Sequence, residues 1–305
     1  MKIIAIGHFS LDVVAGPDGA ATERYGGIWN AVSALSSLAK NGDSVVPVFG
    51  VSKEEYRPVI EHLGLLSRVE TSAVYQYDQP TPRVFVRVTE GRTTVTCSPT
   101  IAPPIPFEKI RRQLDADALL VNLVSGFDIA LDTLDEIRMA VRLSGTPIHL
   151  DYHNVTLGLR ENRDRYRRPV QEWRRWAFMV DTCQLNEEEI AGLSIEQLSE
   201  EQTVAHLLSV GVKGVLVTRG ARGVTTYVDQ RKRTVRQDIP AVPMEASPAV
   251  GMGDVFGAAF LYQYKATKNV IVAAEFANRF ASRHAAAIHL TDGAARAEAP
   301  VRDHT

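Results

Sequence analysis

The sequence predicts an α/β fold: a three-layer sandwich with a central, mostly parallel sheet and a small β-sheet set apart from it. From Asp117 onward, apolar runs typical of buried strands alternate with helical segments, which indicates a parallel sheet covered on both faces. Residues 72–97 consist of short alternating runs joined by turn residues, which favours antiparallel strands. The 305 residues are 45% hydrophobic, enough for one large domain with a real core. We therefore expect residues 1–305 to form a single domain.

The composition narrows the class of protein. The formal net charge is −2, so the basic excess that usually marks a nucleic-acid-binding protein is missing. Cys97 and Cys183 lie far apart without metal-type spacing, which is typical of reduced thiols in a cytoplasmic protein. No apolar run is long enough to span a membrane or to form a signal peptide. We expect a cytoplasmic protein whose partner is a small molecule, with neither nucleic acid nor a membrane as partner.

The N-terminal part predicts two buried strands and one helix. The run "KIIAIG" (2–7) is rich in isoleucine and ends in glycine, as a buried strand does. "NAVSALSSLAKNG", which starts at Asn30, repeats apolar residues at helical spacing and ends at Gly42. "DSVVPVFGV" after it is again typical of a strand.

The next segment, 72–97, predicts the small sheet. Its runs "AVYQYDQ", "PRVFVRVTE" and "TTVTC" alternate in polarity, and we expect them to lie apart from the main sheet. We expect a lid built from about 13–25 and 72–100 that covers the substrate and excludes water. An exposed edge of this sheet could pair with a second copy of the chain and give a homodimer.

The second half predicts strands and helices in alternation. The runs "ALLVNLV", "TPIHLDY", "AFMVDTCQLN" and "GVLVTRG" are expected strands, with "LDTLDEIRMAVRLSG" and "EQTVAHLLSVG" as helices between them. Two further helices, "GDVFGAAFLYQYKA" and "NVIVAAEFANRFASRHAAAIHL", close the chain. Ligands of open α/β sheets bind beyond the carboxyl ends of the strands, so the residues that end strands are the candidates for a site.

The first candidates follow the first strand. Asp12, just past that strand, could bind the hydroxyl groups of a polyol, or it could be a turn residue that caps the backbone. Gly26 and Gly27 would let a ligand approach the backbone, and Asn30 offers both donors and an acceptor to a sugar hydroxyl. The alternative is a glycine turn followed by an N-cap asparagine.

Two later strand ends could serve a nucleotide. Asn186 and Glu189, three residues apart on one helix face, could hold a hydrated Mg²⁺, although acidic residues also suit the first turn of any helix. Thr218, Gly220 and Gly223 could form a wall for a nucleotide or a plain hairpin turn.

The stretch "VGMGD" is the strongest candidate. Gly251 and Gly253, on either side of Met252, free the backbone to aim N–H groups at one point, and the following helix adds its positive end, so the turn predicts an anion site. Asp254 would repel that anion, and a carboxylate beside a phosphoryl group makes sense as the acceptor of a proton from the attacking hydroxyl. The alternative is an aspartate that caps its helix.

These motifs, in this order, resemble the ribokinase-like sugar and nucleoside kinases, also called the phosphofructokinase-B family. The resemblance extends over nearly the whole chain: "GHFSLD", "YGGIWNAVSALSSL", the β-rich insertion, "NEEE", "VTRGARG", "GMGD" and "FANRFA". It implies a ribokinase-like α/β core with a β lid, ATP and Mg²⁺ as donor, and a sugar or nucleoside as acceptor. It implies these roles: Asp12, Gly26, Gly27 and Asn30 for the substrate, Asn186, Thr218, Gly220, Gly223 and Asn278 for ATP, Glu189 for Mg²⁺ through water, Gly251, Met252 and Gly253 as anion hole, and Asp254 as base.

The sequence also departs from the family pattern. The late signature usually begins with Asp-Thr, where this chain has Pro248 and Ala249, and that part helps to build a monovalent-cation site. We therefore expect weak or no activation by potassium. The same departure supports an alternative, a catalytically impaired ligand-binding or regulatory protein, against which the retained Asp254 argues. Phe9 and Trp29, near Asp12 and Asn30, could stack on a nucleobase or belong to the core. The substrate, the hydroxyl that is phosphorylated and the oligomeric state stay open.

Overall fold

The structure is a computed structural model that describes residues 1–15, 21–89, 92–96, 100–162, 164–242 and 250–292. Its main sheet has nine strands, which are β1 (Lys2–Ile6), β4 (Ser44–Ser52), β5 (Val74–Tyr77), β8 (Ala118–Asn122), β9 (Ile148–Asp151), β12 (Thr182–Asn186), β13 (Gly214–Thr218), β14 (Val224–Gln230) and β15 (Arg233–Ile239). Their order across the sheet is β15-β14-β13-β12-β9-β8-β1-β4-β5. All neighbours from β13 to β5 pair in parallel, and β14 and β15 add an antiparallel edge.

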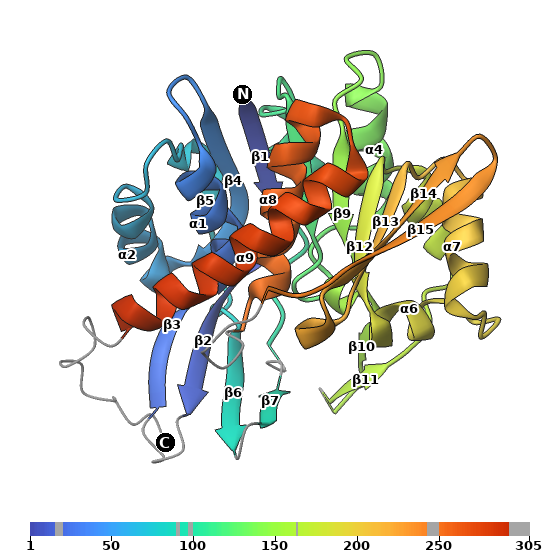
Figure 1. The fold of residues 1–305 in the computed structure, drawn as a ribbon. Coiled ribbons are helices and arrows are strands. Elements are labelled where there is room, and N and C mark those ends of the chain that lie inside the picture. Colours follow the sequence, from blue (N-terminus) through green and yellow to red (C-terminus); the bar gives the residue numbers. More distant parts are fainter. Residues whose placement is uncertain (16–20, 90–91, 97–99, 163, 243–249, 293–305) are drawn as a thin grey trace.

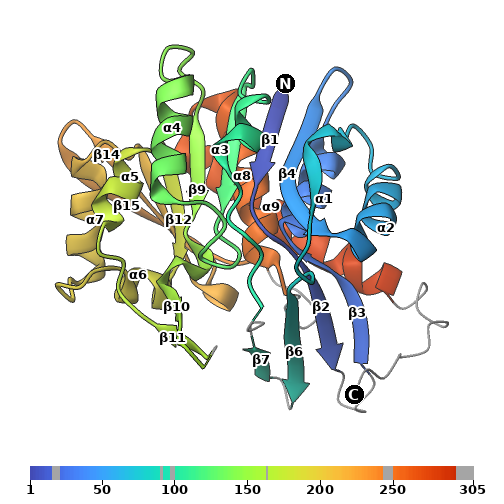
Figure 2. The same cartoon turned by 180° about the vertical axis from the view of Figure 1, so that it is seen from behind.

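Helices cover both faces of this sheet (Figures 1 and 2). One face packs against α1 (Ile28–Leu38), α2 (Lys53–Leu63), α8 (Met252–Thr267) and α9 (Val270–Asp292). The other packs against α3 (Phe107–Arg111), α4 (Leu131–Val141), α5 (Trp173–Phe178), α6 (Glu187–Leu193) and α7 (Glu200–Ser209). Each face has its own cluster of buried apolar side chains, because strands covered on both sides bury alternate residues in opposite directions. The expected three-layer architecture is confirmed.

A small sheet of four strands projects from the end of the main sheet where β1 ends (Figure 1). It consists of β2 (Phe9–Ala15), β3 (Ala21–Gly27), β6 (Arg83–Thr89) and β7 (Arg92–Thr96) in the order β3-β2-β6-β7. The β2–β3 and β6–β7 pairs are antiparallel, whereas β2 and β6 are parallel, so the sheet is mixed rather than purely antiparallel. Residues 16–20, 90–91 and 97–99 of the expected lid lie outside the described residues.

Two sequence-based expectations about this region are wrong. The run containing Val74 and Tyr75 was expected in the small sheet, but β5 pairs in parallel with β4 at the edge of the main sheet. Its alternation has another cause, because Val74 packs into the core on one face and Tyr75 into the core on the other. Asp12 was expected just past the first strand, but β2 begins at Phe9, so Asp12 lies within a strand of the small sheet.

The remaining described elements are short. A hairpin of β10 (Leu157–Leu159) and β11 (Arg165–Arg167) projects beside α6 on the side of the small sheet (Figure 2). Single 3₁₀ turns are η1 (Thr71–Ala73), η2 (His153–Thr156) and η3 (Gly220–Arg222). Cys183 is a buried free thiol in β12. Within the described ranges, none of the helices combines the length and apolarity that crossing a membrane requires.

Candidate functional site

The carboxyl ends of three neighbouring strands meet at one edge of the main sheet. Asn122 is the last residue of β8, Asp151 of β9 and Asn186 of β12. Asn122 and Asp151 stand opposite each other in register. Because ligands of open α/β sheets bind at this edge, the side chains here are candidates for function.

Asp254 lies over this edge, in the first turn of α8. Its carboxylate accepts a hydrogen bond from Nδ2 of Asn122 at 2.8 Å and another from Nδ2 of Asn30 at 3.1 Å. The side chain is 4% exposed. A capping aspartate would bond the N–H groups of its own helix, but the N-cap of α8 is Gly251 and no side-chain cap is present. The helix-cap alternative therefore does not describe Asp254, whose carboxylate is held by two amides from other elements.

The turn before Asp254 leaves the N-terminus of α8 open. Gly251 has φ 89°, and a Cβ built on it would lie 2.2 Å from Nδ2 of Asn30, so a side chain does not fit. The first N–H groups of a helix have no partner within the helix. At the start of α8, the N-cap Gly251 supplies no side-chain cap for these groups, which include the N–H groups of Met252 and Gly253. Together with the helix dipole they suit a phosphoryl oxygen.

Asp12 and Gly26 are packed directly against each other across the β2–β3 pair. A Cβ on Gly26 would lie 2.1 Å from Oδ1 of Asp12, so glycine at this position makes room for the carboxylate. Ser10 Oγ donates to Oδ1 of Asp12 at 3.0 Å, and Nε of Arg24 lies 3.9 Å from Oδ2. Burial raises the pKa of Asp12 to about 6, against the opposing charge of Arg24. Asp12 therefore changes its charge at mildly acidic pH.

Gly27 links the small sheet to α1. It is the N-cap of α1, with φ 61°, and the next residue, Ile28, donates its N–H to the carbonyl of His8 at 3.0 Å. Asn30 therefore stands in the first turn of α1, not at its N-cap as one alternative held. From there its amide reaches Asp254.

Buried carboxylates gather around Asp254. Burial, mainly, raises the pKa of Asp151 and that of Glu189 to about 8 each, and the charge of Asp254 adds to both shifts. The charge of His153 opposes the shift of Asp151. Both groups therefore hold their protons at neutral pH in the free protein, and a bound cation would favour their charged forms.

Sequence reasoning missed Asn122, Asp151 and Gln184. Gln184, on β12, donates from Nε2 to Oδ2 of Asp151 at 3.1 Å and to the carbonyl of Gly253 at 3.0 Å, so it ties the sheet to the turn before Asp254. Asn122 and Asp151 each stand at the end of an apolar run. This position at a strand end is the feature of the sequence from which they could have been predicted as site residues. Neither is flanked by glycine, so no motif singled them out.

Asn186 and Glu189 form a reciprocal cap of α6. Oδ1 of Asn186 accepts from N–H of Glu189 at 2.8 Å, and Oε2 of Glu189 accepts from N–H of Asn186 at 2.7 Å. The two residues thus form a capping box, and Glu189 is one of the acidic residues in the first turn of α6. Each oxygen of Glu189 still has a lone pair free for water, because a carboxylate offers about four acceptor positions. A hydrated Mg²⁺ beside Glu189 thus fits the donor atoms present.

The expected nucleotide-binding turn joins β13 to β14. Thr218 is paired in register with Asn186 on the next strand. Gly220 and Gly223 begin and follow η3, and a Cβ on Gly223 would lie 2.1 Å from the carbonyl of Ile239. Asn278, on α9, donates to the carbonyl of Pro240 at 2.7 Å, so it contacts the same segment after β15 as Gly223 does. Asn278 and Gly223 thus both adjoin the segment that follows β15.

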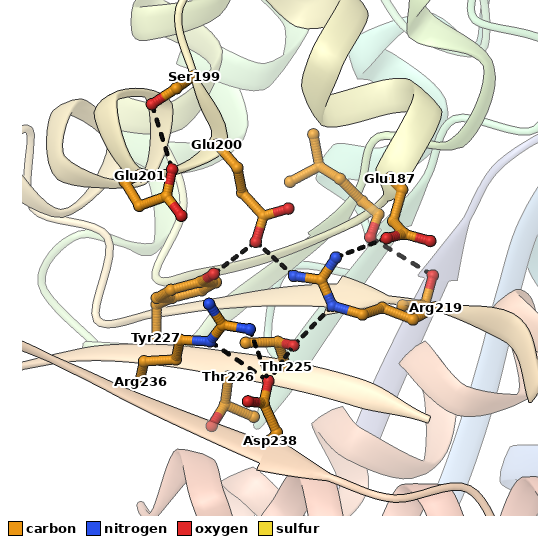
Figure 3. Close-up of polar contacts among 12 residues, drawn as sticks. Glu187, Ser199, Glu200, Glu201, Arg219, Thr225, Thr226, Tyr227, Arg236 and Asp238 are labelled. Carbon is orange, nitrogen blue, oxygen red and sulfur yellow. Dashed lines mark hydrogen bonds and ion pairs between the residues drawn. The ribbon is translucent and has the colours of Figure 1, made fainter. Parts of the chain in front are cut away.

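Ion pairs tie this turn to α6 and α7, and Figure 3 shows those of Arg219. Arg219 donates from Nη1 to Glu187 at 2.7 Å and also bonds Glu200, while Arg222 bonds the other oxygen of Glu187. Nε of Arg219 donates to Thr225 Oγ1 at 2.7 Å. The network borders an open pocket of about 410 Å³ on the α7 side of β14 and β15. Glu187 directly follows Asn186, so these ion pairs join the two elements expected to hold a nucleotide.

Phe9 belongs to the core. Its ring stacks on that of Phe49 with centroids 5.4 Å apart, and Trp29 meets it edge-on at 6.5 Å. Because Phe9 is fully buried, it has the role of a core residue and is not exposed for stacking on a nucleobase. Close by, a cavity of about 30 Å³ is lined by His8, Phe9, Ser10, Pro82, Val84, Thr100, Ile101, Val124, Ser125 and Arg165.

Solved structures share this fold at low sequence identity. A pyrophosphate-dependent kinase of the ribokinase family, described as a sulfate complex, is 18% identical with a TM-score of 0.74, over 94% of this chain and 95% of that one. Ribokinase from Thermotoga maritima is 20% identical (TM-score 0.70; 93% and 92% covered). Arabidopsis thaliana ribokinase complexed with ribose and ATP is 19% identical (TM-score 0.69; 92% and 91% covered). At these identities, the likeness shows the fold.

Sequence comparison identifies the family. No curated protein matches the sequence. The profile of pfkB family carbohydrate kinases matches residues 66–286, more than half of the chain, and includes the strand ends at Asn122, Asp151 and Asn186 as well as Asp254. This protein therefore belongs to the pfkB family of carbohydrate kinases, and the reaction class that follows is phosphoryl transfer.

Proposed function

We propose that this protein transfers the γ-phosphoryl group of ATP to a hydroxyl group of a sugar or of a nucleoside ribose, with Asp254 as proton acceptor. The observation that carries the proposal is the position of Asp254. Its carboxylate is held by Asn122 and Asn30 beside the open N-terminus of α8. A proton acceptor thus lies next to a site suited to a phosphoryl group.

The acceptor would lie between the small sheet and α8. Asp12 would accept hydrogen bonds from its hydroxyl groups, with the backbone of Gly26 and Gly27 beside it. Asn30 would hold Asp254 toward the reacting hydroxyl. The small sheet would cover this molecule and exclude water, which competes as an acceptor of the phosphoryl group.

The donor would lie along the turn between β13 and β14. Thr218, Gly220 and Gly223 would line it, with Asn278 on the opposite side and the N–H groups after Gly251 at the transferred group. When bound, Mg²⁺ would neutralise charge on the phosphates, and Glu189, with Asn186 beside it, would hold it through water. The residues of the chain then orient the two reactants, which is most of what phosphoryl transfer needs.

A panel assay tests this proposal. Sugars and nucleosides are offered with Mg²⁺ and either ATP or pyrophosphate, because structural neighbours include both a ribokinase bound to ATP and pyrophosphate-dependent kinases. We expect ADP release with at least one acceptor and none from the Asp254→Asn variant. Turnover with pyrophosphate alone would overturn the choice of donor. Binding of an acceptor without turnover of either donor would favour the alternative, a catalytically impaired binding protein.

We also propose a cytoplasmic homodimer that forms through the small sheet. The strands β3 and β7 lie at its edges, and Phe85, on β6, is 49% exposed. Unpaired strand edges readily pair with a second copy. Sedimentation equilibrium of the wild type and of a Phe85→Lys variant is the test, with a dimer expected only for the wild type. A monomeric wild type contradicts it.

A further inference from the structure

Two carboxylates and an imidazole converge at the carboxyl end of the main sheet. They belong to Asp151 at the end of β9, His153 in η2 and Asp254 in α8, and one ligand atom of each lies within 4.8 Å of the others. Both carboxylates are buried, and the imidazole is half-buried. Metal ions hold such ligands at roughly 2.0–2.2 Å, so ligands on opposite sides of an ion are about 4 Å apart. The spacing of the three side chains therefore suits a single ion.

A fourth group at this place has no partner. Asn122 is 0% exposed, and its Oδ1 has no hydrogen-bond partner among the described residues. Nδ2 of the same amide donates to Asp254, and Asn122 stands opposite Asp151 in register. A buried amide oxygen without a partner is costly. A cation beside Asp151 and Asp254 would supply the missing interaction.

The backbone holds His153 in place. His153 has φ 35°, in the left-handed region that non-glycine residues seldom adopt. Its N–H donates to Oδ1 of Asp151 at 3.2 Å, which fixes the turn between the two residues. Unfavourable backbone conformations of this kind persist where the surrounding structure enforces them and often mark functional sites.

We propose that Asp151, His153 and Asp254 form a binding site for a divalent transition-metal ion, distinct from the Mg²⁺ expected at Glu189. Mg²⁺ prefers ligands that are all oxygen, whereas an imidazole favours first-row transition ions. Both oxygens of Asp254 have a lone pair left after their amide bonds, so one can bind the ion while the other faces the acceptor. The site does not depend on the proposed reaction, and binding can be measured on the full chain without nucleotide or acceptor.

The test uses Mn²⁺ as the probe. Calorimetry and electron paramagnetic resonance on the metal-free full chain should show one bound Mn²⁺ per chain, with spin-echo modulation from an imidazole nitrogen. The Asn186–Glu189 pair contains no nitrogen of this kind, so the modulation separates the two sites. Zn²⁺ should displace the Mn²⁺ at equal concentration, as the stability order of divalent ions requires, and excess Mg²⁺ should not.

Matched variants complete the test. His153→Gln should lower the affinity for Mn²⁺ at least about tenfold and abolish the nitrogen modulation, because loss of even a supporting residue costs about that much. His206→Gln changes an exposed histidine on α7 and should leave both unchanged. Circular dichroism checks that the variants fold, and Asp151→Asn provides a second variant should His153→Gln unfold. Four outcomes would each overturn the proposal. These are absence of Mn²⁺ binding, binding without nitrogen modulation, equal displacement by Mg²⁺, and unchanged affinity in a folded variant.

Discussion

Asn30 donates a hydrogen bond to Asp254 at 3.1 Å across 224 positions of sequence. Asn30 follows directly from the small sheet through Gly27, and Asp254 follows directly from the turn at Gly251. The bond therefore joins the element that would bind the acceptor to the element that would bind the phosphoryl group. Substitutions on the acceptor side should therefore change KM for the acceptor, and substitutions on the donor side should change KM for the donor.

Replacement of Asp254 by Asn should remove most phosphoryl transfer. The variant keeps the size of the side chain but loses the proton acceptor, so we expect kcat to fall roughly 10²–10⁴-fold. Donor binding by calorimetry should stay within about threefold of the wild type, since no donor contact is assigned to this side chain. Asp229→Asn, an exposed aspartate on β14, is the control and should turn over normally. Near-normal transfer by the Asp254 variant would exclude it from the mechanism.

Acceptor binding should weaken in mild acid because Asp12 becomes protonated. Burial raises its pKa to about 6, so the carboxylate is ionised at pH 8 and takes up a proton as the pH falls through 6. A protonated carboxyl group accepts hydrogen bonds less well, and KM for the acceptor should therefore rise below about pH 6. The pH profile of KM checks this. In Asp12→Asn, KM should be high and show no step near pH 6; a persisting step would assign the titration to another group.

The raised pKa of Asp12 also affects the stability of the folded protein. Acid weakens acceptor binding, but it favours the folded state through this group. Between the ordinary pKa of an aspartate, 3.8, and about 6, the folded protein binds a proton at Asp12 that the unfolded chain has released. Stability contributed by this group is therefore lost as the pH rises through that window. Wild type and Asp12→Asn, compared by thermal unfolding between pH 4 and 7, should differ in slope, with the steeper decline in the wild type. Parallel curves would contradict the expectation.

Replacement of Gly26 by alanine should impair acceptor binding selectively. The new methyl group would lie 2.1 Å from Oδ1 of Asp12 and would displace that carboxylate. Overpacking of this kind costs about 1–3 kcal/mol, so KM for the acceptor should rise about tenfold or more, with KM for the donor unchanged. Gly192→Ala, in α6 with open space around it, is the matched control and should bind both as the wild type does. Equal loss for both reactants would indicate general disruption.

Loss of Glu187 should loosen the donor side instead. Glu187 pairs with Arg219 and Arg222, which flank the turn at Gly220. Partly exposed ion pairs contribute only modestly, so Glu187→Gln should raise KM for the donor about threefold to tenfold. KM for the acceptor should stay constant, and Glu201→Gln, beside the same pocket, should change neither. A rise confined to the acceptor would refute this link.

Potassium should activate the enzyme weakly or not at all. The family's usual Asp-Thr is replaced by Pro248 and Ala249, which removes side-chain oxygens that a cation site commonly uses. These two residues lie outside the described residues. Turnover in sodium and in potassium at equal ionic strength provides the comparison, and a large rise specific to potassium would disprove the expectation.

Local patterns were sufficient to predict most of the fold. The spacing of apolar residues along α4, α7, α8 and α9 and in the strands between them depends on neighbours in sequence, which is why these elements were expected correctly. The pairing of β5 was not local. Its alternation fits either sheet, and only contact with β4 decides between them. The parallel pairing of β2 with β6 is equally a matter of tertiary structure.

The site was predictable where a motif marked it. The end of the first strand drew attention to Asp12, and glycines drew attention to Asn30 and Asp254. The structure brings the surroundings of these residues together. Asn122 and Asp151 are single polar residues at strand ends, and only the packing of β8 and β9 beneath α8 shows that they adjoin Asp254. The ion pair between Glu187 and Arg219 likewise forms only because β12 and β13, which precede these residues, lie side by side.

The strands of the small sheet contribute different kinds of side chain. Asp12, Arg24 and Gly26, which adjoin the proposed reaction centre, all come from β2 and β3. From β6, the apolar side chain of Val84 lines the small cavity. Val84 stands opposite Asp12 in the parallel pair of β2 and β6, so an exchange at Val84 changes the neighbour of this carboxylate but not the carboxylate itself. In a duplicated gene, such exchanges would let one copy acquire a new substrate while it keeps the old reaction. Libraries that vary Val84 are thus a practical route to kinases of altered preference.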